Sequence, residues 1–336
     1  MRDCRKLLEK LKTKYREQFD FIKEKAAEKD KYFLGIRDNY LGLYYKGHRM
    51  AKIEVSNSKV TYSIAQYYVS EQNVNPDKMK FEEFRDNFNY ITDQIDGHVG
   101  GKNKKLRPER VCQQWIMNQN NADILSDWYF LDMEYVQSRQ SGRIDMIAVK
   151  CKADEKGKHA VALIELKVGT KADGGASGLI KHMDDFMKLL DNADKYNRIR
   201  EELSYMISSY KELGLIDSKN ELNKVTSAEQ FAKKPDIYFL NYTYVSVPDF
   251  EGQGKEKLSS IKESFYRYLY DSDNCLEKTL KKEKIDGILK RKENFLGDLE
   301  NSNIITCRQQ IGEEDYRFIF QFIDPEKISP QWRCLE

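Results

Sequence analysis

Apolar residues recur every three to four positions near the start of the chain, among lysines and glutamates: Leu7, Leu8, Leu11, Tyr15, Phe19 and Ile22. This spacing puts them on one face of a helix and predicts a single amphipathic helix over residues 1–30. The pattern then changes to β-branched and aromatic runs over 32–70, broken at 38–39, 46–47 and 56–58. Such runs predict a meander of three or four short antiparallel strands.

The middle of the chain alternates between helical and strand-like patterns. A second amphipathic helix is expected over 77–96, followed by a flexible basic loop, DGHVGGKNKK, that marks a module boundary. Pro108 suits the first turn of the next helix. The elements expected after it are strands over 128–137, 142–150 and 159–168, helices over 176–190 and to about 213, and a strand over 236–245.

This order of elements, α-β-β-β-α-β, predicts an α/β fold in which the first three strands are antiparallel neighbours and the last arrives by a helical crossover. Charged helices are expected within 255–299, and a terminal hairpin is expected from IITCRQQ and YRFIFQFI. The chain then divides into an N-terminal helix and β-meander module (1–100), an α/β core (101–246) and a C-terminal helical and β-hairpin extension (247–336).

Composition places the chain among globular proteins with a real core. It has 336 residues, of which 33% are charged and 40% hydrophobic, with 21 Tyr and 16 Phe. The net charge is only +2, so any attraction to nucleic acid has to come from local basic clusters. The densest clusters are at 102–110, 278–284 and 289–293. Solvated helix faces and loops account for most such runs.

The six cysteines, at positions 4, 112, 151, 275, 307 and 334, form no C-x-x-C pair and have no histidine at zinc-ligand spacing. This pattern argues against a zinc site or a disulfide framework and favours reduced thiols in the cytoplasm. No apolar run is long enough for a signal peptide or a membrane span.

Charged residues interrupt two of the most apolar segments of the chain, SGRIDMIAVK and AVALIELKVG. Side chains two apart on a strand face the same way, so Glu165 and Lys167 share one side of their strand. If the two segments pair as a hairpin, Asp145 lies beside Glu165 on that side. Two carboxylates side by side on adjacent strands suit Mg²⁺ or Mn²⁺, with a main-chain carbonyl and waters completing the site.

Asp145 followed about one hairpin later by Glu165-Leu166-Lys167, within an α-β-β-β-α-β series, resembles the PD-(D/E)XK (restriction-endonuclease-like) nuclease superfamily. The resemblance covers roughly residues 105–245. It implies that Asp145 and Glu165 bind the metal together with the backbone carbonyl of Leu166, and that Lys167 is the catalytic lysine. It also implies that Glu109, on the helix before the sheet, adds a further acidic group; a carboxylate favoured by the helix dipole is the alternative.

Two positions depart from the family pattern. Ile144 stands where the motif has proline, a change that leaves the chemistry untouched. On the next helix, His182 and Phe186 occupy the spacing at which many members carry Gln-x-x-x-Tyr. Either His182 replaces the glutamine as a phosphate or water contact, or the motif is absent and the substrate is positioned differently.

The function expected from this resemblance is metal-dependent hydrolysis of phosphodiester bonds, most simply an endo- or exodeoxyribonuclease of restriction, phage-defence or repair type. Two alternatives remain open: a catalytically inactive nuclease fold that binds nucleic acid or protein, and a purely structural ion pair between Lys167 and Glu165 or Asp145. A monomer and a homodimer are both compatible with the sequence.

Other polar and aromatic residues near these motifs have weaker expectations. Lys102, Lys104, Lys105 and Arg107 would contact phosphates beside the scissile bond, unless they belong to a solvated loop. Glu134 could face the site from the first strand, but an exposed edge charge is the favoured expectation. The tyrosines of the meander could stack on bases or line a half-buried sheet: Tyr40, Tyr44, Tyr45, Tyr62, Tyr67 and Tyr68.

Overall fold

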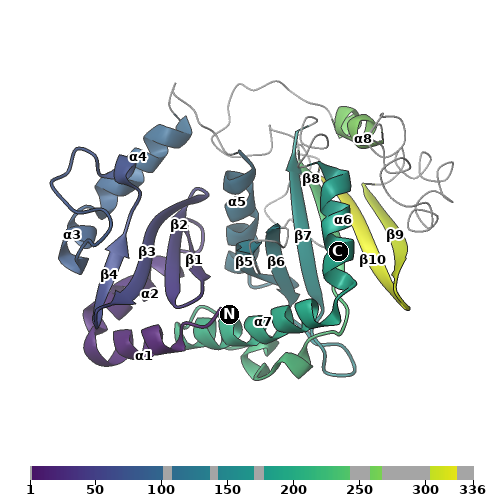
Figure 1. Ribbon diagram of the computed structural model, residues 1–336, viewed down its shortest axis with the longest axis horizontal. Helices are drawn as coiled ribbons and strands as arrows, with labels where there is room; N and C mark the ends of the chain where they lie inside the picture. The colour runs from purple at the N-terminus through teal and green to yellow at the C-terminus, as the bar shows by residue number, and fades with distance from the viewer. Residues whose placement is uncertain are drawn as a thin grey trace. The chain divides into compact units, whose positions relative to one another are not determined.

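The computed structural model describes residues 2–100, 108–136, 143–169, 178–242, 258–266 and 303–323. These residues form two compact units, whose helices and strands are drawn in Figure 1. The first unit takes its described residues from Met1–Asp132 and Arg200–Gln230, and the second takes them from Met133–Ile199 and Phe231–Arg333.

The first unit begins with two helices, α1 (Arg5–Lys14) and α2 (Arg16–Ala27). The expectation of one helix over 1–30 is therefore wrong. The backbone leaves the helical region at Tyr15, with φ −131° and ψ 51°, and the Tyr15 hydroxyl donates a hydrogen bond to the carbonyl of Ser58 at 3.2 Å. Both helices keep their apolar residues buried, so the three-to-four-residue period continues across a break that it does not reveal.

The predicted meander is confirmed as a four-stranded antiparallel sheet in the order β1-β2-β3-β4. Its strands are β1 (Tyr32–Ile36), β2 (Tyr40–Tyr45), β3 (His48–Ser56) and β4 (Lys59–Ser63). Each turn contains residues with positive φ, at Asn39, at Lys46 and Gly47, and at Asn57 and Ser58. Asparagine and glycine adopt this conformation at low cost, which is why these dipeptides marked the turns in the sequence.

The segment after the meander also forms two helices, α3 (Phe81–Asp86) and α4 (Phe88–Gly100), rather than the single helix expected over 77–96. They meet at Asn87, whose side-chain amide donates to the carbonyl of Glu83 at 2.8 Å. Because α4 continues through Gly100, residues 97–100 are helical and not part of a loop.

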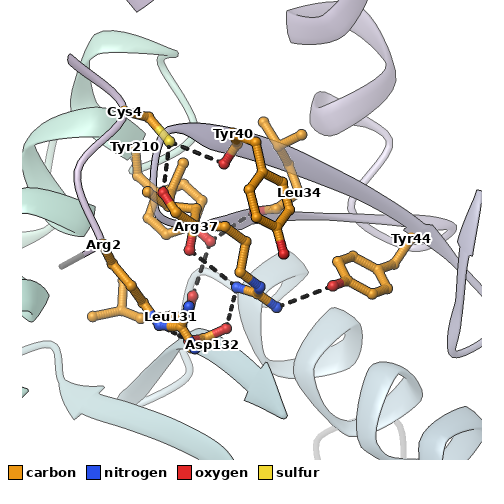
Figure 2. A network of polar contacts seen from close by, with 10 residues as sticks. Arg2, Cys4, Leu34, Arg37, Tyr40, Tyr44, Leu131, Asp132 and Tyr210 are labelled. Atoms are coloured by element: carbon orange, nitrogen blue, oxygen red, sulfur yellow. Dashed lines mark hydrogen bonds and ion pairs between the residues drawn. The ribbon is translucent and has the colours of Figure 1, made fainter. Parts of the chain in front are cut away.

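A buried charged cluster joins elements of the first unit that are far apart in sequence (Figure 2). Asp132 is fully buried and forms ion pairs with Arg37 and, at 2.6 Å, with Nε of Arg2. Burial by itself would lower the pKa of Arg37, but the adjacent Asp132 carboxylate and the neighbouring tyrosines together outweigh it and raise that pKa. The hydroxyl of Tyr210 lies 2.7 Å from the carbonyl of Leu34 and 2.9 Å from that of Leu131, and it can donate to either.

The predicted elements of the central segment are confirmed, with small changes at their ends: α5 (Pro108–Ala122), β5 (Trp128–Val136), β6 (Arg143–Lys150), β7 (Val161–Val168), α6 (Leu179–Leu190), α7 (Ala193–Glu212) and β8 (Asp236–Tyr242). Strands β6 and β7 are antiparallel, and β7 and β8 are parallel. The chain from β7 to β8 passes through α6 and α7, which is the expected helical crossover.

The predicted terminal hairpin is confirmed as β9 (Ile304–Ile311) and β10 (Glu314–Ile323), preceded by α8 (Leu258–Tyr266). Strand β10 pairs in parallel with β8, so the hairpin belongs to the same sheet as the central strands. The sheet has the order β5-β6-β7-β8-β10-β9 (Figure 1). The fold is therefore α/β, with one four-stranded antiparallel sheet and one six-stranded mixed sheet.

Candidate active site

Strands β6 and β7 bring Asp145 and Glu165 together in the interior of the second unit. Met146 pairs with Ile164, and continuing this register by one residue puts Asp145 opposite Glu165. Opposite residues of an antiparallel pair point to the same side of the sheet, as the sequence predicted. The two strands are further tied by the backbone N–H of Leu166, which donates to Oδ2 of Asp145 at 2.9 Å.

Two nitrogen donors converge on one oxygen of Glu165. Nζ of Lys167 lies 2.8 Å from Oε1, and Nε2 of His182, on α6, lies 3.0 Å from the same oxygen. The Glu165 and Lys167 side chains are only 1% and 5% exposed. A buried charge needs a close partner, so this geometry answers why the sequence tolerates both charges in an apolar strand.

His182 is thereby placed against the acidic residue of the motif, and not on an unrelated surface. Helix α6 covers this face of the sheet, because Phe186, one turn after His182, contacts Phe239 of β8 with ring centroids 5.8 Å apart. A structural ion pair between two residues of β7 does not require a third group from α6. A purely structural explanation therefore accounts least well for the contact between His182 and Glu165.

Arg143 and Glu134 extend the cluster toward β5. The guanidinium of Arg143 lies 3.1 Å from Oε2 of Glu134 and 3.7 Å from Oδ1 of Asp145. The Glu134 side chain is 14% exposed, so the expectation of an exposed edge charge is wrong. Its φ of 56° is unusual for a non-glycine residue inside a strand and costs about 1–3 kcal/mol.

Asn241 is a further polar residue of this sheet face that the sequence argument missed. It lies on β8 as the register partner of Lys167, so the two side chains share a face. It is 1% exposed, and its amide nitrogen donates to the carbonyls of Phe239 at 3.3 Å and Gln321 at 3.5 Å. The available signal was a lone amide in the aromatic strand DIYFLNY.

The donor set suits a hard divalent cation, since it contains two carboxylates on adjacent strands. Within the described ranges, however, no group of three or more His, Cys, Asp or Glu side chains is arranged to hold a metal ion. Side-chain nitrogens of Arg143, Lys167 and His182 contact these carboxylates in this structure. Asp145 and Glu165 are the residues that could hold a metal; the part of the Leu166 carbonyl stays a prediction.

Of the remaining predicted site residues, one lies in the first unit and four fall outside the described residues. Glu109 lies in the first turn of α5, in the first unit, and its role stays a prediction. The basic residues Lys102, Lys104, Lys105 and Arg107 fall outside the described residues, as do the basic clusters at 278–284 and 289–293.

The tyrosines of the meander favour the sheet interpretation over a stacking platform. Tyr62 and Tyr68 are buried, and Tyr44 accepts a hydrogen bond from the guanidinium of Arg37 at 3.3 Å. Tyr67, which is 51% exposed, is the one tyrosine among the large exposed hydrophobic side chains of the described residues. A platform for successive bases needs several exposed rings on one face.

Comparison of the chain with family models, with curated proteins and with solved structures finds no match in any of the three. Over the ranges that the structure describes, none of the helices is both long enough and apolar enough to cross a membrane.

Proposed function

We propose that this protein is a metal-dependent nuclease that hydrolyses phosphodiester bonds in DNA, with a restriction-endonuclease-like α-β-β-β-α-β core. One observation carries the proposal. Asp145 and Glu165 lie opposite each other on paired strands, and both the lysine of the motif and a histidine from α6 contact Glu165. Desolvated clusters of titratable groups of this kind occur preferentially at functional sites.

Each residue of the cluster has a distinct part in this chemistry. Asp145 and Glu165 would hold Mg²⁺ or Mn²⁺, which supplies polarisation of a phosphoryl oxygen and acidification of a bound water. Lys167 carries a positive charge next to Glu165, where it stabilises negative charge that develops on the phosphate. His182 contacts the same carboxylate and is placed to contact a phosphate oxygen or the attacking water.

The runner-up is a nuclease fold without activity that binds nucleic acid or another protein. The observation in its favour is that Glu165 already has two nitrogen partners, so its carboxylate is not left without contacts when no metal is bound. The two functions differ in one respect that is simple to measure, namely whether DNA is cut in a metal-dependent way.

The test is incubation of the purified protein with plasmid and linear DNA in Mg²⁺, Mn²⁺ or EDTA. We expect cleavage in Mn²⁺ or Mg²⁺ and none in EDTA. Asp145→Asn and Glu165→Gln should each abolish cleavage, and the double variant should be no worse than either single, because the two ligands act as a unit. Glu155→Gln, an exposed acid in the turn between the same two strands, is the matched control.

Stability has to be measured alongside activity. Glu165→Ala would leave the buried Lys167 without its carboxylate, so this variant should melt at a lower temperature than the wild type. The isosteric amides are therefore the better reagents. Near-native turnover of Asp145→Asn would refute the assignment of the site, and an inactive wild type in all three buffers would favour the binding module.

A further inference from the structure

Lys167 has a polar neighbour on the next strand. Asn241 is its register partner in the parallel pair β7–β8, two residues along from the pair formed by Glu165 and Phe239. Register partners in a parallel pair point to the same side of the sheet, so Asn241 faces the same side as Glu165 and Lys167. Helix α6, which carries His182, packs on this side through Phe186 and Phe239.

The amide of Asn241 is oriented by its own hydrogen bonds. Its nitrogen lies near two backbone carbonyls, those of Phe239 and Gln321, which can only accept. This fixes which side-chain atom is the oxygen. That oxygen, Oδ1, is buried and accepts no hydrogen bond from any residue in the described part of the chain.

A buried carbonyl oxygen without a donor is costly, and in an otherwise apolar strand a leucine of similar size would avoid the cost. Asn241 therefore lies where a hydrogen-bond acceptor is useful in a state other than the one observed. The nearest residue on the same face of the adjacent strand that carries a donor is Lys167, whose ammonium group has three N–H donors.

We propose that Asn241 is a positioning residue for Lys167: its Oδ1 accepts a hydrogen bond from the Lys167 ammonium group when a divalent cation engages Glu165. This inference rests on the proposed nuclease function. If Glu165 held a metal, Lys167 would lose part of its contact with this carboxylate, and an ammonium group inside the sheet would then need another acceptor. With Asn241 as acceptor, Lys167 stays beside the reacting phosphate and does not adopt several orientations.

The experiment compares four variants with the wild type. Asn241→Leu removes the oxygen at similar volume, and Asn241→Ala removes the same oxygen while leaving space, so it replaces the leucine variant if leucine is not accommodated. Asn241→Asp keeps an oxygen in place. Gln321→Leu is the matched control, because Gln321 on β10 is also a buried amide whose oxygen lacks a donor in the described residues, but it pairs with Leu240 and so faces the opposite side.

We expect Asn241→Leu to lower kcat by about 10- to 100-fold, the usual effect of losing a residue that orients a catalytic group. The KM for DNA and the Mn²⁺ affinity measured by calorimetry should stay within about twofold, because Asn241 contacts neither DNA nor metal in this arrangement. Asn241→Asp should recover a large part of kcat, and Gln321→Leu should leave kcat at the wild-type value. The melting temperature of Asn241→Leu should be no lower than that of Gln321→Leu.

Three results would overturn the inference. An Asn241→Leu variant with wild-type kcat, in a protein that is active, refutes it and leaves the nuclease function intact. Equal losses of kcat in Asn241→Leu, Asn241→Asp and Gln321→Leu would show that buried amides in this sheet act only on folding. A wild-type protein that binds no Mn²⁺ and cuts no DNA removes the nuclease function, and this inference with it.

Discussion

Lys167 carries a positive charge in a strand whose eight positions are all buried. Its ion pair with Glu165 makes that burial tolerable, but an apolar pair of similar volume would often be as stable or more so. Stability therefore does not explain why these charges are inside the sheet. The proposed hydrolysis, which needs a fixed cation at this place, would explain it.

The first prediction follows for Lys167. Lys167→Met, which keeps the length of the side chain, should lower cleavage far more than it lowers DNA affinity, because one cation among many phosphate contacts adds little to binding. Turnover in Mn²⁺ and DNA binding in EDTA are the two measurements. If the loss of affinity accounts for the whole loss of activity, Lys167 is only a phosphate anchor.

The second prediction at this scale concerns Cys4, which is almost completely buried. Its thiol lies 3.0 Å from the carbonyls of Arg37 and Tyr40, and burial raises its pKa to about 12. The neutral thiol is therefore favoured in the folded state, whereas the unfolded thiol ionises above its ordinary value of 9.0. The unfolded state then binds fewer protons, so the free energy of unfolding should fall as the pH rises from 9 toward 12.

Cys4→Ala isolates this contribution. Its unfolding free energy should decline less steeply above pH 9 than that of the wild type, by at most about 1.4 kcal/mol per pH unit. Urea denaturation at several alkaline pH values provides the measurement. Identical slopes in the two proteins would mean that Cys4 is already ionised, or equally protected, in both states. At pH 8, Cys4 should resist alkylation while the half-buried Cys151 reacts.

At the scale of the elements, the sequence predicted which segments are helices and strands better than where helices are interrupted. The strand pattern over 128–168 is strong because β-branched and aromatic runs are bounded by polar turns. The breaks at Tyr15 and Asn87 have no proline or glycine to mark them. They accompany hydrogen bonds, from Tyr15 to a distant turn and from Asn87 to the preceding helical turn, that the periodicity of apolar residues does not encode.

The candidate site could likewise be predicted from the sequence only in part. Asp145 and Glu165 could be paired from the sequence because a hairpin connects neighbours along the chain, and its register follows from its length. Asn241 could not be placed beside Lys167, because the register across a helical crossover depends on how α6 and α7 pack. Glu134 was misjudged because its ion pair with Arg143 of the neighbouring strand cannot be inferred from the sequence.

The third prediction concerns the turn between β2 and β3. Gly47 has a φ of 74°, its N–H donates to Oε1 of Gln114 on α5 at 2.7 Å, and a Cβ atom there would lie 2.5 Å from the backbone carbon of Arg110. Gly47→Ala should therefore combine backbone strain with a backbone clash, and lower the unfolding free energy by more than about 2 kcal/mol.

Gly157→Ala separates the two effects. Gly157 has a similar φ of 71°, but an added Cβ would meet nothing within 4 Å. This variant should show only the conformational penalty, about 1 kcal/mol. Urea denaturation of both variants gives the comparison. Equal destabilisation would show that the turn moves away from α5 at little cost.

The fourth prediction concerns the terminal hairpin. Six residues of β10, Phe318–Ile323, pair with Ile237–Tyr242 of β8, and Phe239 stacks on Phe320 with ring centroids 5.1 Å apart. A chain that ends at residue 246 would expose this edge of β8, so it should aggregate or lack a cooperative thermal transition. A chain that ends at 323, which keeps every described strand, should retain the transition. A folded, monomeric 1–246 chain would show that the hairpin is a dispensable extension.

At the scale of the whole molecule, charge limits how DNA could be bound. With 57 basic and 55 acidic residues, the chain has almost no net attraction for a polyanion, so affinity has to come from clusters that act at short range. The candidate site contributes little, because its basic side chains are engaged with carboxylates. The DNA binding that the proposed function requires would therefore have to use basic residues elsewhere in the chain.

The fifth prediction assigns that part to Lys102, Lys104, Lys105 and Arg107, which precede α5. Phosphate contacts without base contacts act independently of sequence and weaken with salt. Neutralising all four should weaken binding similarly for unrelated DNA sequences. It should also flatten the slope of log affinity against log salt concentration by roughly 3 to 4 units if every residue meets a phosphate, at about 0.9 per contact.

The control for this experiment is neutralisation of the basic residues within 278–293, which covers the other two dense basic clusters of the chain. Binding isotherms over a series of salt concentrations distinguish the two surfaces, because each slope counts the phosphates that its cluster neutralises. An unchanged slope in the 102–107 variant, with a flattened slope in the 278–293 variant, would move the DNA to the C-terminal segment. The residues before α5 would then belong to a solvated loop, and the substrate would reach Asp145 and Glu165 without their help.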